Sequence, residues 1–315
     1  MMKKANFLLL LLALVVACKE APRVETPPMT AEELRLARCG SVDSVMPRLA
    51  VSLRAVEGYA ALDTISAEAW LLVDDATGWV ISQKNAAQRM YMASLTKMMT
   101  CLVALENGKM ADSIDILRAD IVTHDSRVRP GQSYTLRNLL YEMMLLSDND
   151  AAYAVARHVG GDSLGFYRMM NEKAAYLGMG DTHFDNPNGM PNDSNYSSAR
   201  DLMRLVRYAM ADSTFAAMVG TADMDVPLTD GRHLPCHNTN ALLGTYDGCI
   251  GVKTGFTRQA GCCLASAARR GGTTLVLVLL KSTSMPRRFS ESAALLDYGF
   301  RVMEAADLHS AITGK

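Results

Sequence analysis

The sequence has almost no net charge and few aromatic side chains. Its 32 lysines and arginines balance 33 aspartates and glutamates, which gives a formal net charge of −1, and aromatic residues make up only 6%. This balance provides neither the basic surface that binds nucleic acid nor an acidic tail. Seven cysteines among 315 residues are too few for a fold held together by disulfides.

Apolar residues, by contrast, are plentiful. They make up 49% of the chain against 21% charged residues, so the protein can bury a sizeable core and is not expected to be disordered. The mean hydropathy is near zero, which excludes a membrane protein with many spanning helices. Methionine is unusually common, at 21 residues, and we interpret it as flexible core filler. The length fits one large domain or two modest ones.

The first 18 residues have the layout of an export signal. Two lysines precede a short apolar run from Phe7 to Val16, which is too short to span a membrane. The run ends in Ala17-Cys18, which resembles the processing site of bacterial lipoproteins, although Val15 stands where such sites usually have leucine. The resemblance implies that Cys18 is lipidated and becomes the mature N-terminus. An ordinary signal peptide with an incidental cysteine is the alternative.

The segment 19–62 is expected to be a tether and a leader helix. Its polar, proline-containing start suits a tether. Thr30 and Glu33 have the spacing of a capping box, so a helix is predicted to begin there.

Strand patterns occur at both ends of the remaining sequence, and helical patterns lie between them. Apolar runs separated by turn residues predict strands at 69–73, 79–81, 249–256, 262–268 and 273–280. Apolar residues at helical spacing predict helices over 95–107, 136–146, 151–159, 163–177 and 199–210. We therefore expect an α+β fold, with a helical cluster packed on a five-stranded antiparallel sheet.

A serine and a lysine three residues apart stand where the chain enters the first of these helices. Residues i and i+3 share a helix face, so the side chains of Ser94 and Lys97 can meet. Serine is a poor nucleophile unless a base takes its proton. Lysine can be that base if burial or a second cation lowers its pKa towards neutrality. Taken alone, this pattern is expected about once by chance in a chain of this length.

Two further short motifs follow in the chain. Ser147-Asp148-Asn149 lies between two predicted helices, where a hydroxyl and an amide can point into one cleft, although all three residues also favour helix caps. Lys253-Thr254-Gly255 lies on a predicted strand, where a cation and a hydroxyl suit a substrate carboxylate. The glycine allows a ligand to approach the strand closely.

The three motifs occur once each, in this order, and each has the structural context that it needs. The set is typical of penicillin-binding proteins and class A β-lactamases. The chain resembles the serine-type D-alanyl-D-alanine carboxypeptidases, or low-molecular-mass penicillin-binding proteins, over about residues 65–303. Further stretches carry the resemblance: Asp75–Gly78, Ala93–Thr100, Ser147–Ala152, Met170-Asn171, Leu177–Met179, Thr182–Gly189, Gly251–Thr257, Arg288 and Tyr298–Phe300.

The resemblance implies a fold of this superfamily, with the active site between sheet and helices. The catalytic domain would cover 63–304 and a short tail 305–315. Some members of the family carry a further β-rich domain and an amphipathic C-terminal anchor. We expect neither after Phe300, and a lipid on Cys18 would replace that anchor.

The resemblance also implies the residue roles. Catalysis falls to Ser94, Lys97 and Ser147; substrate binding falls to Asn149, Lys253, Thr254, Gly255, Phe256 and Arg288. Ser94 would be acylated by the penultimate D-Ala of a peptidoglycan stem pentapeptide and release terminal D-Ala, with Lys97 as base. Ser147 would relay a proton together with Lys253.

Binding roles follow from the same likeness. Asn149 would hold the substrate peptide, and Thr254 with Arg288 would bind its terminal carboxylate. The backbone N–H groups of Ser94 and Phe256 would form the oxyanion hole. No metal or cofactor is implied. The partners would be the stem peptide, β-lactams as inhibitors and a membrane on the periplasmic side, reached through the lipid on Cys18.

Three other functions remain open. An endopeptidase that cuts D-Ala cross-links shares the same motifs. Asp148 is the residue that class A β-lactamases have at this place, but their deacylation needs a loop glutamate, and the only glutamate between the second and third motifs is Glu172, inside a predicted helix. A non-catalytic cell-wall-binding lipoprotein is the third alternative, and the intact motifs argue against it.

The remaining reactive side chains are expected to be structural. His233, Cys236 and His237 lack a second pair at zinc-site spacing, so no metal is predicted there. Cys262 and Cys263 alternate on a strand and point to opposite faces, so at least one should pack as a small apolar residue.

Overall fold

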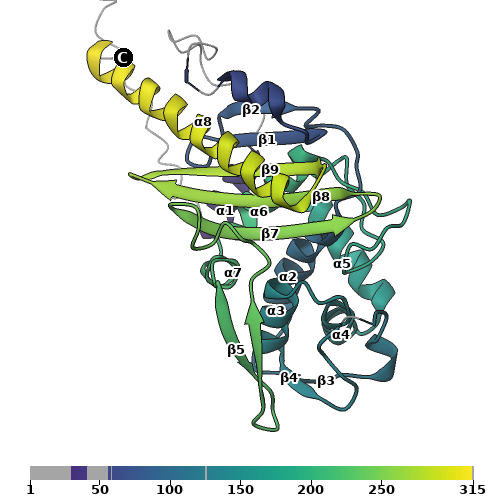
Figure 1. The fold of residues 1–315 in the computed structure, drawn as a ribbon. Helices are drawn as coiled ribbons and strands as arrows, with labels where there is room; N and C mark the ends of the chain where they lie inside the picture. Colours follow the sequence, from purple (N-terminus) through teal and green to yellow (C-terminus); the bar gives the residue numbers. More distant parts are fainter. Residues whose placement is uncertain (1–29, 41–55, 58, 125, 314–315) are drawn as a thin grey trace, which may run out of the picture.

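The computed structural model describes residues 30–40, 56–57, 59–124 and 126–313 (Figure 1). The predicted export signal and Cys18 lie outside the described residues. A helix, α1 (Ala31–Gly40), begins after Thr30, and the predicted capping box is confirmed. The Thr30 hydroxyl accepts from the Glu33 amide at 3.1 Å, and the Glu33 carboxylate accepts from the Thr30 amide at 2.6 Å. No helix in the described part of the chain is long and apolar enough to cross a membrane.

A five-stranded antiparallel sheet forms the centre of the fold, as predicted. Its strand order is β2-β1-β9-β8-β7. The strands are β1 (Ala69–Asp74), β2 (Val80–Lys84), β7 (Cys249–Thr257), β8 (Gly261–Arg270) and β9 (Thr273–Ser282). The first strand of the chain pairs with the last, with Trp70 opposite Leu279, so the two ends of the sequence close into one sheet. In this strand order, β2 and β7 form the two edges of the sheet.

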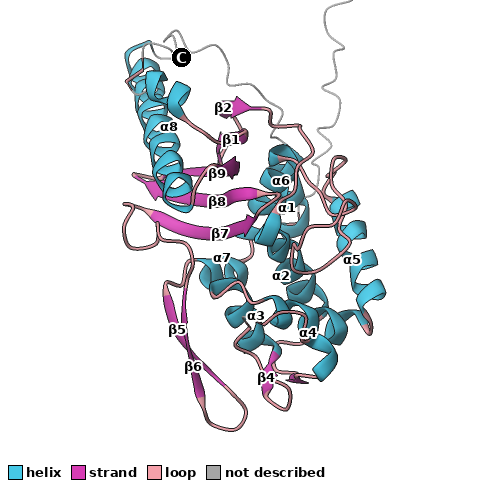
Figure 2. Cartoon of the chain, turned by 45° about the vertical axis from the view of Figure 1, so that its right-hand side comes forward, coloured by secondary structure: helices cyan, strands magenta, loops and turns pink. Residues whose placement is uncertain are grey.

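Both faces of the sheet are covered, which gives three layers (Figures 1 and 2). Alternate residues of β1 point to opposite faces. Leu71 packs into the larger core with the helical cluster, whereas Leu72 packs into a second core with α8 (Met285–Thr313). Both side chains are fully buried. Because both faces of β1 and β9 are buried, these two strands are nearly continuous apolar runs in the sequence.

The helical cluster lies on the other face of the sheet. It contains α2 (Thr96–Asn107), α3 (Leu136–Leu145), α4 (Asn149–Gly160), α5 (Ser163–Tyr176), α6 (Ala199–Met210) and α7 (Ser213–Val219). Every residue from Thr96 to Ala104 is buried, so α2 is the central helix of the cluster. Side chains of Thr135, Asp148, Asp162, Ser198 and Asp212 cap the N-termini of the other five.

Several elements were not predicted from the sequence. Two small hairpins consist of β3 (Ser113–Asp115) with β4 (Ser133–Thr135) and of β5 (Asp223–Pro227) with β6 (His233–His237). Three-residue strands, or strands that carry proline and charge, give no clear apolar alternation. The short 3₁₀ helices are η2 (Tyr59–Thr64), η3 (Ala93–Leu95) and η4 (Arg118–Asp120). The helix α8 was also not predicted, and it runs through the expected domain end at 304.

Truncating either face of β1 tests this three-layer arrangement. We expect Leu71→Ala and Leu72→Ala each to lower the free energy of unfolding by about 2–5 kcal/mol, because each leaves a cavity in a filled core. Urea unfolding followed by circular dichroism measures the loss. Leu164→Ala is the control, since that side chain is 74% exposed. If Leu72→Ala behaved like the control, α8 would not cover the outer face of the sheet.

Candidate active site

Ser94 lies in a short turn that leads directly into the central helix. It is the middle residue of η3, and α2 begins two residues later. Ala93, just before it, has a φ of +48°, a conformation that residues with a side chain rarely adopt. Such strain is concentrated at functional sites. The Lys97 Nζ lies 3.1 Å from the Ser94 Oγ, so the predicted i, i+3 pairing is confirmed.

Lys97 is fully buried and is held by three different segments of the chain. Besides Ser94, its Nζ donates to the Asn149 Oδ1 at 2.8 Å and to the Asn188 carbonyl at 2.7 Å. Burial lowers the pKa of Lys97 to about 7, although the nearby acidic side chains, Asp148 first, oppose the shift. A large share of Lys97 is therefore neutral near pH 7 and can accept the serine proton.

The second motif spans the tight connection between α3 and α4 and the first residue of α4. Ser147 has a φ of +62°, again a strained conformation. The Asp148 carboxylate caps α4 through the amides of Asp150 and Ala151, at 2.8 and 3.1 Å. It also accepts from the Ser126 hydroxyl. Asp148 is therefore a structural residue that fixes the backbone on which Ser147 and Asn149, the predicted site residues, lie.

The third motif lies on the edge strand β7, where its lysine and threonine are buried. Lys253 donates to the Thr254 carbonyl at 3.1 Å, and the Thr254 hydroxyl lies 2.6 Å from that of Thr239. Burial, and then the positive charges of Lys97 and Arg288, hold the pKa of Lys253 well below its usual value. No hydrogen bond joins Ser147 to Lys253 among the described residues, so the proton relay between them stays a prediction.

The edge strand passes directly against the turn that carries the nucleophile. A Cβ atom on Gly255 would lie 3.1 Å from the Ser94 amide nitrogen and 3.1 Å from the Met92 carbonyl. A side chain here would press on this turn, so glycine favours the close approach. The side chain of Phe256, the next residue, is 49% exposed. The expected oxyanion donors, the Ser94 and Phe256 amides, therefore belong to two segments in contact.

Arg288 adds a third cation beside this strand. It lies in the first turn of α8, is buried, and donates through one terminal nitrogen to the Gly255 carbonyl at 3.1 Å. Its Nε has no hydrogen-bond partner in the described structure. Burial lowers the pKa of Arg288. A buried cation with a free donor can bind a substrate carboxylate.

Two contributors to the site were missed in the sequence. The first is the loop that supplies the Asn188 carbonyl. Its next residue, Gly189, has a φ of +88°, and a Cβ there would lie 1.9 Å from the Ala93 carbonyl oxygen. The Asn-Gly pair is a turn signal, but contact with Ser94 depends on the tertiary fold. The second is Glu142, the only acidic or basic residue in the apolar run Leu139–Leu146, whose burial such a pattern could have indicated.

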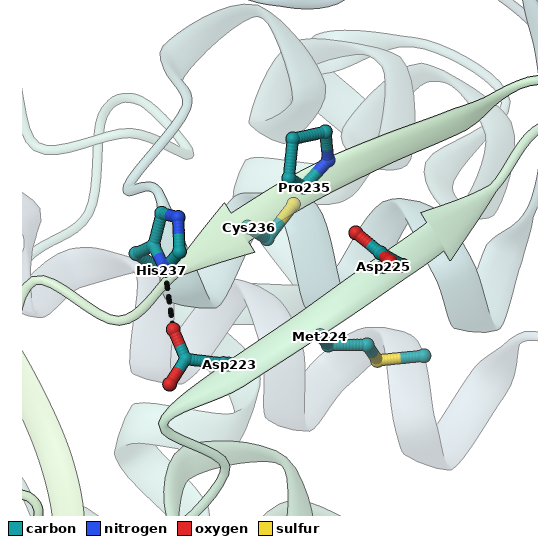
Figure 3. A pocket seen from close by; sticks show the side chains of 6 residues that line it. All are labelled: Asp223, Met224, Asp225, Pro235, Cys236 and His237. Atoms are coloured by element: carbon teal, nitrogen blue, oxygen red, sulfur yellow. Dashed lines mark hydrogen bonds and ion pairs between the residues drawn. The ribbon is translucent and has the colours of Figure 1, made fainter.

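Other reactive side chains lie apart from this site. A pocket on the β5–β6 hairpin is lined by Cys236 and His237, and the imidazole of His237 pairs with Asp223 (Figure 3). Within the described ranges, no cluster of three histidine, cysteine or acidic side chains could hold a metal ion. Cys262 and Cys263 form no disulfide. Both are buried, because β8 is an inner strand with two covered faces.

These features define a class of enzyme: a serine acyl-transfer enzyme with a buried lysine base on an α+β fold. A family model described as D-alanyl-D-alanine carboxypeptidase matches residues 56–284. The chain belongs to this family and is a serine-type peptidase.

Individual relatives agree with this assignment. A D-alanyl-D-alanine carboxypeptidase of Streptomyces sp. (strain K15) is 37% identical over 256 residues, which cover 75% of this chain and 88% of that protein. A D-alanyl-D-alanine endopeptidase of Pseudomonas aeruginosa is 30% identical over 231 residues, covering 71% and 74%. The solved structure of the Streptomyces K15 DD-transpeptidase matches with a TM-score of 0.72 at 37% identity, covering 75% and 97% of the two chains. The predicted fold class is thereby confirmed.

The low pKa of Lys97 predicts how acylation depends on pH. Protonated Lys97 cannot accept the serine proton, so the acylation rate should rise as pH increases through about 7. At one unit below this midpoint the rate should be about tenfold lower than on the plateau. Stopped-flow acylation by a fluorescent penicillin between pH 5 and 9 measures the profile. A rate that still rises tenfold per pH unit up to pH 9 would contradict the assignment of Lys97 as base.

Proposed function

We propose that this chain removes the terminal D-alanine from peptidoglycan stem pentapeptides through an acyl-enzyme on Ser94. The observation that carries the proposal is the fully buried Lys97 amine, 3.1 Å from the serine hydroxyl and with a pKa of about 7. Lys97 takes the hydroxyl proton as Ser94 Oγ bonds to the penultimate D-Ala carbonyl carbon. The C–N bond to the terminal residue then breaks.

The leaving amine needs a proton, and Ser147 with Lys253 would supply it. Both belong to motifs that border Ser94, and Lys97 is close enough to Lys253 to lower its pKa. Water then attacks the acyl carbonyl, which releases the shortened peptide and restores the Ser94 hydroxyl. The Ser94 and Phe256 amides would stabilise the oxyanion in both steps.

The cations at the site favour a substrate with a free carboxylate. Lys253 and Arg288 are buried without an acidic partner among their hydrogen bonds, and the Arg288 Nε has none at all. A terminal D-Ala carboxylate would neutralise this positive charge, with the Thr254 hydroxyl as a further donor. Asn149 uses its amide oxygen on Lys97, which leaves its NH₂ group for a substrate carbonyl.

A rapid β-lactamase is disfavoured by the position of Glu172. It lies in α5 and borders a surface pocket with Glu106, near the C-terminal end of α2. Lys97 lies nine residues before Glu106 on α2, which places the two residues about 13 Å apart at the usual helical rise. Glu172 therefore cannot activate a water at Ser94, and β-lactams are expected to form long-lived acyl-enzymes.

Substrate cleavage by the wild type and Ser94→Ala tests the activity. The wild type should release D-Ala from intact pentapeptide muropeptides and leave cross-linked dimers uncut, as followed by chromatography and mass spectrometry. Ser94→Ala should lose both this release and penicillin labelling, by at least about 10³-fold, because the nucleophile is gone. Cleavage of dimers alone would make the chain an endopeptidase instead. A wild type that neither releases D-Ala nor is labelled by penicillin would be a non-catalytic binder.

We also propose that the chain is exported and anchored by a lipid on Cys18. The sequence layout supports this, and the tether at 19–29 would reach at most about 40 Å from the membrane surface to α1. Related cell-wall peptidases are extracellular or periplasmic, which is the side of the membrane where the proposed peptidoglycan substrate lies.

Replacing the anchoring cysteine tests this localisation. Cys18→Ser should move the protein from the membrane fraction to the soluble exported fraction and abolish incorporation of a labelled fatty acid. Muropeptide hydrolysis by the purified variant should stay within about twofold, because Cys18 contributes nothing to catalysis. Fatty-acid incorporation that survives the substitution would rule out this anchor.

A further inference from the structure

Glu142 is a buried carboxyl group beside the active site to which the reaction assigns no role. It lies on α3 between apolar neighbours, and its exposed fraction is 0%. Neither of its carboxyl oxygens receives a hydrogen bond from any donor in the described structure. An ionised carboxylate without donors is very costly to bury, so this environment favours the protonated acid.

The Asp148 carboxyl group lies within side-chain hydrogen-bonding reach of Glu142, across the start of the α3–α4 connection. Asp148 itself is well supplied with donors, from the Ser126 hydroxyl and the Arg127, Asp150 and Ala151 amides. Two adjacent carboxyl groups in a dry site cannot both be charged. The donors decide which one ionises: Asp148 keeps the charge and Glu142 keeps the proton.

Other titratable groups that face Glu142 do not change this assignment. They come from four packed segments: Lys97 on α2, Arg127 before β4, Tyr134 on β4 and Cys236 on β6. Burial raises the pKa of Glu142 well above its usual value, and Asp148 raises it further. The opposing effects of the two cations are smaller. Glu142 and Asp148 together then carry a single negative charge next to Lys97.

We propose that Glu142 is a positioning residue for the reaction: its protonated carboxyl donates a hydrogen bond to Asp148 and so holds the α3–α4 connection. This inference rests on the proposed roles of the residues that the connection carries, Ser147 and Asn149. It has an electrostatic consequence as well. A second negative charge beside Lys97 would favour its ammonium form, and a neutral Glu142 avoids this.

Two substitutions separate the hydrogen bond from the volume of the side chain. Glu142→Gln keeps a neutral donor, so acylation by a fluorescent penicillin should stay within about threefold and the acid limb of its pH profile within about 0.3 unit. Glu142→Met fills the space without a donor. It should acylate at least about tenfold more slowly. The acid limb should shift to higher pH, because Asp148 loses a hydrogen-bond donor and its negative charge then favours the ammonium form of Lys97 more strongly.

Several outcomes would overturn the inference. Wild-type rates in Glu142→Met would mean that the side chain only fills space. An acid limb that moves to clearly lower pH in Glu142→Gln would mean that Glu142 is ionised in the native protein. Glu172→Gln is the matched control, an exposed helical glutamate that should change neither rate nor profile.

An infrared measurement tests the protonation state without any substrate. The wild type at pH 7 should show the carbonyl band of a buried, protonated carboxylic acid, and Glu142→Gln should lack it while Glu172→Gln retains it. Absence of the band in the wild type contradicts the inference even if Glu142→Met does not fold. Failure of the wild type to react with penicillin would instead contradict the proposed function and leave the band unaffected.

Discussion

The structure depends on keeping one lysine amine out of water and against one serine hydroxyl. Lys97 has no exposed surface, and its Nζ contacts groups from the η3 turn, the start of α4 and the Asn188 loop. Each of these contacts requires an unusual local feature. Ala93 and Ser147 adopt positive φ angles, and Gly189 passes so close to Ala93 that no side chain fits. The packed layers on both sides of the sheet supply the stability that maintains these strained positions.

The charges around this lysine are arranged asymmetrically. Three buried basic side chains, Lys97, Lys253 and Arg288, face a site where Asp148 provides the principal negative charge, and that charge is already bound to amides and a hydroxyl. Burial, and then the positive charges of Lys97 and Arg288, lower the pKa of Lys253. These basic side chains also prepare the site for an anionic substrate before any ligand arrives. Burial therefore makes Lys97 a base, and the donors of Lys253 and Arg288 lie beside it for a substrate carboxylate.

The parts of the fold and site that depend on short contiguous patterns of residues could be predicted from the sequence. The Ser94–Lys97 contact follows from helix geometry alone, and the five strands follow from apolar runs bounded by turns. The sequence could not place Asn188 or Glu142 beside Lys97, because those contacts join segments 45 to 91 residues apart. It also left α8 unassigned, although this helix completes the outer layer and carries Arg288. The capping box at Thr30 and Glu33 shows that local hydrogen bonds remain predictable even in the leader segment.

The most direct test is the titration of Lys97 itself. The chain can be labelled with ¹³C at the lysine side chains, and Lys97→Arg identifies the resonance that belongs to this residue. The account predicts a midpoint at about 7 for this one signal, with the exposed lysines titrating near their ordinary value of about 10.4. A Lys97 signal that titrates with the exposed lysines would contradict the account, because the amine would then be charged at neutral pH and could not activate Ser94.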